Sequence, residues 1–276
     1  MKKNTTDENF PVGRFIKKSL RYLVESYYQA AREADDITDN HELNIEEKQT
    51  HLNELQKDFM TAANDTAAGK LGQLFVAENL DYRLFTDLLE AFRKDVKGGA
   101  PLIWEQLLDY CRYSAAPVGR FMLAIHNQDP ATYMPAEILC AVLQITNHLH
   151  DLKSDACLLR RCYIPFDLLE KFEVRITDFC LAQSTTCVKN LISDVVLRLQ
   201  AMLDDAKILI SLISDYRLRC EVGVIFSLTN SMLKKIQKED VISKAPRLSA
   251  MDWLKGGFYG VWCAFAVRAK SCSRIK

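Results

Sequence analysis

Two rows of polar side chains on otherwise apolar helical segments are the residues of this sequence that could do chemistry. The apolar residues of segment 136–155 recur at helical spacing and cover nearly every side, which predicts a central, buried helix. Its polar side chains stack along one face at steps of three, four and four, and they are Gln144, Asn147, Asp151 and Asp155. A buried carboxylate without a partner is strongly unfavourable, so this row requires a cation or a ligand. The alternative is that 151–155 leaves the core and forms a solvated surface, and the row alone favours neither.

A second polar row lies on the apolar helical segment 17–38. At steps of four, three and four it contains Tyr28, Arg32, Asp35 and Asp39. Two such rows arise by chance far less often than one DxxxD pattern. If they face each other across a cavity, their hard carboxylate oxygens suit Mg²⁺, which takes one or two protein carboxylates together with substrate phosphate oxygens. The predicted chemistry is therefore the ionisation of a diphosphate ester to a carbocation, because the metal neutralises the leaving group.

Arg32 has two roles open to it. Its guanidinium is a fixed fork of donors that could bind phosphate oxygens beside Asp35. It could equally form a salt bridge to Asp35 or Asp36, since both lie about one helical turn away. The sequence leaves both roles open.

Long helices are the elements that must position these rows. Ten Gly and seven Pro residues are few for a β-sandwich or barrel, and no segment alternates apolar and polar residues as a strand does. Helical spacing predicts helices over 17–38, 45–60, 68–79, 81–95, 102–114, 117–127, 136–153, 166–171, 175–187, 188–212, 215–236 and 249–268. No repeat, low-complexity tract or linker divides the sequence. We therefore predict one all-α domain over residues 1–276, with residues 1–8 flexible.

Composition and charge exclude several classes of protein. Hydrophobic residues make up 49% and charged residues 26%, which is typical of a folded soluble protein. Thirty-six basic and 36 acidic residues cancel, so nothing in the charge balance would drive binding to nucleic acid. No CxxC pair occurs among the nine cysteines, and most are interpreted as small buried thiols of a reducing cytosol. Neither a Rossmann nor a P-loop pattern nor a GxSxG element is present.

The two ends of the sequence bear on localisation. The first ten residues lack the apolar stretch of a signal peptide, which favours a cytoplasmic protein. The apolar run 256–267 is too short to span a bilayer, which takes roughly 20 residues. This run leaves open a peripheral contact with the inner membrane surface, but a buried terminal helix is the preferred prediction.

Two aspartate-rich motifs and their neighbours match a known pattern. The motifs are Asp35-Asp36-Ile-Thr-Asp39 and Asp151-Leu-Lys-Ser-Asp155, with Gln144-Ile-Thr-Asn147, Arg161-Cys-Tyr163-Ile-Pro165 and Tyr110-Cys111-Arg112-Tyr113 around them. In this order and spacing, the sequence resembles the squalene/phytoene synthases, the head-to-head prenyl synthases, from about residue 9 to 268. The stretches that look most like the hydroxysqualene synthase branch of bacterial hopanoid pathways are 9–14, 116–120, 147–151 and 246–254.

The resemblance implies an all-α prenyl synthase fold with a central hydrophobic cavity and Mg²⁺ between the motifs. In the hydroxysqualene branch, presqualene diphosphate loses its diphosphate, the cation rearranges, and water captures it to give hydroxysqualene. The implied metal ligands, of which the first and third are also catalytic, are Asp35, Asp39, Asp151 and Asp155. The implied substrate-binding residues are Tyr28, Arg32, Gln144, Asn147, Arg161 and Lys255.

One tyrosine and two histidines complete the candidate residues. Tyr113 matches the family tyrosine near the reacting carbons, where a ring face can stabilise positive charge; its alternative role is helix packing. His150 stands where phytoene-type members usually carry Arg, which removes one phosphate contact of those members. His148 and His150 are two residues apart and cannot share a helix face, so each is expected to pack or to form a local hydrogen bond.

Three hypotheses cover the function. The leading one is Mg²⁺-dependent conversion of presqualene diphosphate to hydroxysqualene, which needs no reductant. The alternative within the enzymes is head-to-head condensation of two prenyl diphosphates to presqualene diphosphate, squalene, dehydrosqualene or phytoene. The third is a non-catalytic helical scaffold, against which the intact carboxylate pairs speak. The expected partners are a prenyl diphosphate, other squalene-pathway enzymes and a membrane surface.

Overall fold

The computed structural model describes residues 16–62, 66–98 and 101–272, with side chains as far as residue 266. Its longer helices are α1 (Arg21–Asp39), α2 (Ile45–Thr61), α3 (Ala67–Ala77), α4 (Arg83–Lys97), α5 (Trp104–Ser114), α6 (Ala116–Ile125), α7 (Tyr133–His150), α10 (Thr186–Ala206), α12 (Tyr216–Lys238) and α13 (Ala250–Cys272). Shorter turns are η1 (Lys18–Leu20), η2 (Pro130–Thr132), α8 (Leu152–Ser154), η3 (Asp155–Leu159), α9 (Phe166–Lys171), η4 (Ile176–Cys180) and α11 (Ile208–Leu212). Within these residues there is no strand, so the predicted all-α fold is confirmed. The predicted flexibility of 1–8 and the stretch 9–14 lie outside the described residues.

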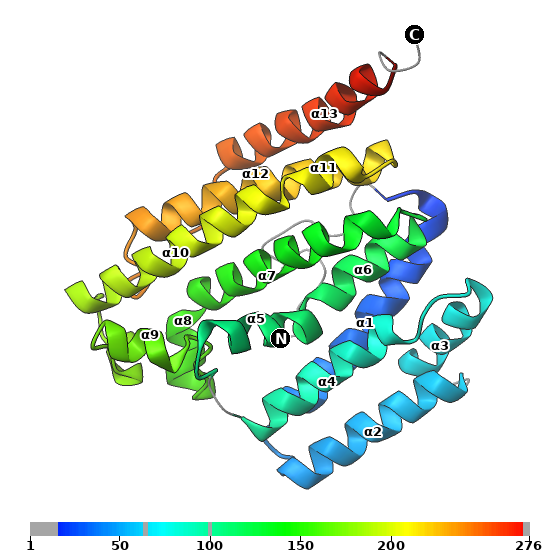
Figure 1. Cartoon of the computed structure of the whole chain (residues 1–276). Helices are drawn as coiled ribbons and strands as arrows, with labels where there is room; N and C mark the ends of the chain where they lie inside the picture. The colour runs from blue at the N-terminus through cyan, green and yellow to red at the C-terminus, as the bar shows by residue number, and fades with distance from the viewer. Residues whose placement is uncertain (1–15, 63–65, 99–100, 273–276) are drawn as a thin grey trace.

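The helices stack side by side from α13 at one end to α2 and α3 at the other (Figure 1). α13 packs along α12, and α10 packs on both α12 and α7. On the other side of α7 come α5 and α6, followed by α4 and α1. The row Tyr28 to Asp39 therefore lies at the C-terminal end of α1, and the row Gln144 to Asp155 runs through and just past the C-terminal end of α7, so both lie in the middle of the stack.

An aromatic cluster fixes the orientation of α1. Tyr27 stacks on Phe121 of α6 with 4.3 Å between ring centroids, and its hydroxyl donates to the carbonyl oxygen of Leu84 at 2.7 Å. Ala34 and Thr38, farther along the same face, are also buried. Because this face is turned into the core, the row that contains Asp35 and its partners lies on the neighbouring side of the helix.

The prediction of a helix over 175–187 is wrong. Within this range η4 forms and is followed by bends at 181–183, and Thr185, which has an extended backbone, caps α10 by accepting from the Val188 amide at 3.2 Å. Ser184 donates from its amide and from its hydroxyl to Asp240, at 3.0 and 2.5 Å. These side chains form hydrogen bonds with backbone amides that would otherwise belong to a continuous helix. Such local competition explains why helical spacing does not produce a helix here.

Candidate active site

The first aspartate-rich motif sits on the last two turns of α1. Asp35 and Asp39 have side chains that are 35% and 43% exposed, so they are accessible without being fully solvated. Arg32 donates to Asp35 at 2.5 Å and to Asp36 at 3.3 Å. The salt bridges weighed as the alternative role of Arg32 are therefore present, and they place its guanidinium beside the motif carboxylates.

The second motif sits where α7 ends. The helix stops at His150, and Asp151 has the dihedral angles of a helix end, φ −97° and ψ 7°. The chain then continues as α8 and the π-helical turn η3, which Arg160 ends in the left-handed conformation at φ 53°. The amide of Asp155 still donates to the carbonyl oxygen of Asp151 at 2.9 Å, so the two aspartates remain one turn apart. The predicted row is retained, although the predicted continuous helix is interrupted within it.

Arg161 joins the two motifs. Its Nη1 donates to Asp39 Oδ1 at 2.9 Å, across 122 positions of sequence. Its backbone amide donates to the carbonyl oxygen of Asp155, also at 2.9 Å. One residue therefore contacts the first motif through its side chain and the second through its backbone, which brings both motifs to one region of the molecule.

A partly buried carboxyl lies next to this joint. Asp95 of α4 accepts a hydrogen bond from the Tyr110 hydroxyl at 3.0 Å. Burial raises the pKa of Asp95 to about 6, against the opposing effects of that hydrogen bond and of the Arg161 charge, while Asp39 and Asp35 raise it further. Asp95 is therefore within electrostatic range of Asp35 and Asp39 of the first motif.

Stacked rings continue from Tyr110 toward the second motif. The ring of Tyr163 lies 5.6 Å from Tyr110 and stacks on His148 at 3.8 Å between centroids. The Gln144 amide donates to Nε2 of His148 at 3.3 Å. Burial lowers the pKa of His148 to about 3, although the Asp151 charge opposes this shift. The imidazole is therefore neutral at physiological pH and adds no positive charge between the motifs.

His150, next to the second motif, behaves differently. Its Nδ1 lies 2.7 Å from Asp151 Oδ1, which accepts the hydrogen bond because a carboxylate has no proton to give. This hydrogen bond raises the pKa of His150, against the effect of partial burial. His148 and His150 thus make a ring stack and a local hydrogen bond, the two kinds of contact predicted for them.

The other predicted site residues lie on α1, α5, α7 and α13. Tyr113 is one turn after Tyr110 on α5, and the Lys94 ammonium lies 4.2 Å from its ring centroid. Tyr28 and Asn147 are half-buried on the motif helices α1 and α7. Lys255 is exposed on α13, one turn before Tyr259. The roles predicted for these side chains stay predictions.

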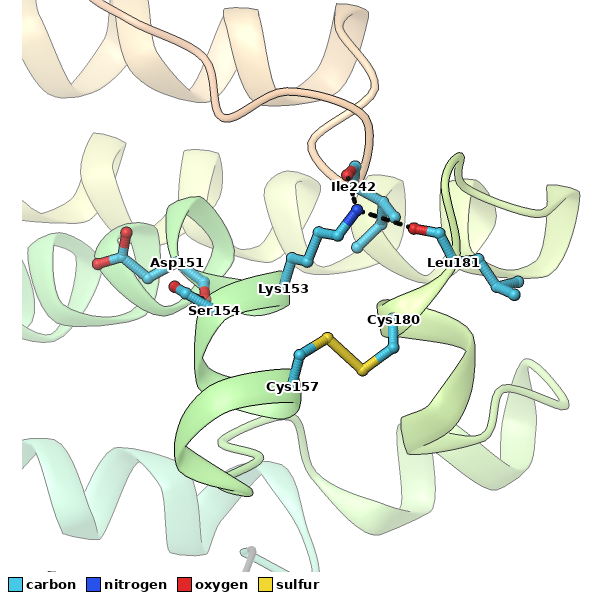
Figure 2. Close-up of a disulfide and its surroundings, with 7 residues drawn as sticks. All are labelled: Asp151, Lys153, Ser154, Cys157, Cys180, Leu181 and Ile242. Atoms are coloured by element: carbon cyan, nitrogen blue, oxygen red, sulfur yellow. Dashed lines mark hydrogen bonds between the residues drawn. A yellow bond between two sulfur atoms is a disulfide. The ribbon is translucent and has the colours of Figure 1, made fainter. Parts of the chain in front are cut away.

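The second motif is attached to segments far away in sequence. Lys153 donates to the carbonyl oxygens of Leu181 and Ile242 at 2.9 and 3.1 Å, on the side of the turn away from the Asp151 carboxylate (Figure 2). Cys157 forms a disulfide with Cys180 of η4, with 5.7 Å between the Cα atoms (Figure 2). These attachments hold the turn that carries Asp155 from outside the site.

This disulfide corrects the prediction for the cysteines. Of the described cysteine side chains outside it, Cys111 and Cys263 are buried free thiols, and the four half-buried ones are Cys140, Cys162, Cys187 and Cys220. Cys157 and Cys180 are instead exposed. Since both lie outside the apolar core, packing does not account for them, and the π-helical turn η3 brings them together.

The donors available to Mg²⁺ are the carboxylates of the two motifs. Among the described residues, no three His, Cys, Asp or Glu side chains are close enough together to hold a metal ion by themselves. Mg²⁺ usually keeps several waters and binds through one or two carboxylates plus substrate phosphates, so an all-protein cage is not required. The partly exposed carboxylates of the two motifs are hard oxygen donors of the kind it prefers. They fit a magnesium ion that is shared with a phosphorylated substrate.

A separate pocket of about 660 Å³ lies near the opposite ends of α1 and α7. Arg120 lines it and pairs with Glu137 at 2.8 Å and with Asp87 at 3.3 Å. This polar pocket does not include the motif residues and is not the predicted hydrophobic cavity, which stays a prediction.

Asp95 is the site residue that sequence reasoning missed. It lies seven residues after Leu88 and four after Ala91, both of which are buried on α4. A carboxyl therefore occupies a position of the apolar face, and this break in the helical pattern is the signal that could have identified it.

Comparison with known proteins agrees with this arrangement. The model of the squalene/phytoene synthase family matches residues 3–252. Hydroxysqualene synthase from Rhodopseudomonas palustris is 33% identical over 258 residues, which cover 93% of this chain and 88% of that protein. The enzyme of the same name from Sinorhizobium fredii is 34% identical over 253 residues, or 91% and 87%. A crystal structure of squalene synthase from Alicyclobacillus acidocaldarius has a TM-score of 0.74 at 30% identity, covering 81% of this chain and 85% of that one.

A structure of lower sequence identity has the same fold over most of the chain. A dehydrosqualene synthase in complex with a ligand has a TM-score of 0.75 at 21% identity, and covers 94% of this chain and 89% of that one. The fold and the two joined motifs define an all-α isoprenoid synthase. The chain belongs to the squalene/phytoene synthase family and is an enzyme of that kind.

Proposed function

We propose that the chain converts presqualene diphosphate to hydroxysqualene with Mg²⁺. The observation that carries the proposal is the Arg161 joint, because it brings carboxylates from two distant segments to one place beside a fixed cation. The choice of this branch is supported by two hydroxysqualene synthases that are similar over about nine-tenths of the chain. Water capture also needs no reductant, in keeping with a sequence that has no dinucleotide-binding pattern.

Different residues of the site would bind the metal and the diphosphate. The carboxylates that would hold the metal are Asp35, Asp39, Asp151 and Asp155. When bound, Mg²⁺ supplies positive charge to the diphosphate and so favours its departure. Arg32 and Arg161 place guanidinium groups beside the same carboxylates, where a diphosphate would otherwise be repelled. Gln144 and Asn147 would contact the diphosphate from α7.

The reaction requires an environment that tolerates a carbocation. The bond between the reacting carbon and the diphosphate oxygen breaks, and both electrons leave with the diphosphate. After rearrangement, a water oxygen bonds to the cationic carbon and loses one proton to give the alcohol. The rings of Tyr110, Tyr163 and neutral His148 present no positive charge to such a cation. Tyr113, the predicted catalytic tyrosine, would act through the ring face that the Lys94 ammonium does not cover.

The decisive experiment is turnover of presqualene diphosphate in ¹⁸O-labelled water with Mg²⁺. The expected result is diphosphate release and one labelled oxygen in an alcohol product. Turnover of farnesyl diphosphate alone to a condensed product, with presqualene diphosphate left unchanged, would overturn the proposal in favour of a condensing synthase. Removal of divalent cations with a chelator should abolish turnover, and added Mg²⁺ should restore it.

A pair of neighbouring aspartates tests whether the motifs are catalytic. We expect Asp35→Asn or Asp151→Asn to reduce kcat/KM by about 100-fold or more, because a charge that stabilises the departing group is lost. Asp36→Asn is the matched control, since Asp36 is on the same helix but outside the row and its side chain is 63% exposed. Equal activity in all three variants would instead support a scaffold whose aspartates have no chemical role.

A further inference from the structure

The last long helix, α13, has two faces with different surroundings. Its inner face is buried on α12 through Gly256, Gly260, Cys263 and Ala264. A Cβ atom at Gly260 would come within 2.5 Å of the Cys220 carbonyl oxygen, so glycine is what permits this close approach. The prediction of a buried terminal helix therefore holds for the inner face alone.

The outer face of α13 is a continuous apolar stripe. Its side chains are between 50% and 71% exposed, and they are Met251, Leu254, Phe258, Val261, Trp262 and Phe265. At 100° per residue they fall within a sector about 100° wide, opposite the buried face, and they extend over about 21 Å of helix. An apolar surface of this length usually marks a binding site.

The sequence from residue 253 onward is basic. Residues 253–276 contain no acidic residue, although the whole chain is balanced, and their basic residues are Lys255, Arg268, Lys270, Arg274 and Lys276. Beside the stripe, the ring of Tyr259 stacks on Trp262 at 5.7 Å between centroids. Tyr259 also lines a pocket of about 470 Å³ that contains Lys207 and Lys234, the former paired with Asp204.

We infer that the outer face of α13 binds a membrane surface that contains anionic lipid. An amphipathic helix that combines exposed aromatic side chains with basic residues lies in the plane of such a surface, where the rings enter the headgroup region and the cations pair with lipid phosphates. No helix among the described residues is long and apolar enough to cross a bilayer, so the contact is peripheral. A second copy would bring an equally basic segment against this one, which makes an anionic lipid the better charge match. The inference does not rest on the proposed reaction.

Vesicle binding of the full chain tests the inference. We expect the protein to co-sediment with vesicles of phosphatidylcholine and phosphatidylglycerol, to bind pure phosphatidylcholine more weakly, and to be released by high salt. Binding should also shift Trp262 emission to shorter wavelength, because Trp104 is buried and Trp253 half-buried. Failure to bind the mixed vesicles would overturn the inference.

Two sets of variants separate the apolar from the charged contribution. The variant F258S/W262S/F265S should lose vesicle binding by about 100-fold, since three large side chains no longer enter the lipid. Replacing Arg268, Lys270, Arg274 and Lys276 by Gln should remove the preference for anionic vesicles.

The matched control is V76S/M134S/L197S, which removes side chains of similar exposure from α3, α7 and α10. It should bind like the unchanged chain, and thermal unfolding followed by circular dichroism should show all three variants folded. Unchanged vesicle binding by F258S/W262S/F265S would overturn the inference. So would a change from dimer to monomer in that variant without any lipid binding by the parent, which would assign the stripe to a second copy.

Discussion

The two aspartate-rich motifs differ in what holds them in place. In the first, Asp35 and Asp39 project from a continuous helix whose other face is buried, and Arg32 pairs with Asp35 from the same helix. In the second, the helix ends at His150, and the turn that follows Asp151 depends on Lys153 and on the Cys157–Cys180 disulfide.

This difference predicts different sensitivity to distant changes. A motif within a packed helix moves only if the helix moves, because each residue is fixed by local backbone hydrogen bonds. A motif at a helix end is positioned by tertiary contacts, so changes outside the site can displace it. Arg161 contacts both motifs: its side chain donates to Asp39 of the first, and its backbone amide donates to Asp155 of the second.

Removal of the Arg161 side chain should have the largest effect. We expect Arg161→Ala to lower kcat/KM by about 100- to 1,000-fold, because it removes the cation beside Asp39 and one joint of the motifs. Arg161→Lys should recover part of the activity, since it restores the charge without the planar fork. Steady-state kinetics with presqualene diphosphate measure both. Arg160→Ala is the control, because Arg160 is the exposed neighbour; an equal loss in that variant would contradict a specific role for Arg161.

Breaking the disulfide should affect the second motif alone. Its loop of 23 residues corresponds to a loss of about 2–3 kcal/mol of unfolding free energy in C157S/C180S. Urea unfolding measures the loss, and hydrogen exchange should become faster over 152–160 but not over 35–39. Cys187→Ser, which removes a half-buried free thiol of α10, is the control. Equal exchange changes in both motifs would show that they are not supported separately.

The Asp95 carboxyl beside the first motif should make the free energy of unfolding depend on pH. Its pKa of about 6 lies above the ordinary 3.8, so between about pH 4 and 6 the folded protein retains a proton that the unfolded chain has lost. The free energy of unfolding therefore falls as pH rises through this window, by an amount on the order of 3 kcal/mol. In Asp95→Asn this contribution is absent. Urea unfolding of both proteins in a chelating buffer should give a difference that changes between pH 4 and 6 and is constant above; a constant difference throughout would contradict the shift.

The sequence predicts what depends on local spacing. The positions of α1 and α7 and the rows Tyr28 to Asp39 and Gln144 to Asp155 follow from helical periodicity, which a single segment contains in full. That the two motifs lie in one region was implied by the family resemblance alone, because the Asp39–Arg161 contact spans 122 positions and no local spacing indicates it.

What the sequence does not reveal depends on tertiary contacts. No Gly or Pro marks the end of α7 at His150, and the left-handed residue Arg160 is not a glycine, so neither boundary has the usual local signal. The disulfide likewise follows from the fold, since Cys157 and Cys180 meet only when η3 and η4 pack together. The structure of the second motif is therefore harder to predict than that of the first, because contacts with segments distant in sequence hold it in place.

The smallest expected effect is that of Lys153. Its ammonium donates to two carbonyl oxygens, those of Leu181 and Ile242, and so ties the second motif to the segments before α10 and after α12. Lys153→Met keeps the aliphatic length and removes both hydrogen bonds, which should cost about 1 kcal/mol of unfolding free energy because the group is partly solvated. Lys189→Met on α10, whose side chain is exposed, is the control. If tertiary contacts hold the second motif, Lys153→Met should also lower kcat by a few fold. The pH dependence of the unfolding free energy that Asp95 causes should stay unchanged. A shift in that pH dependence would contradict the view that the two motifs are supported separately.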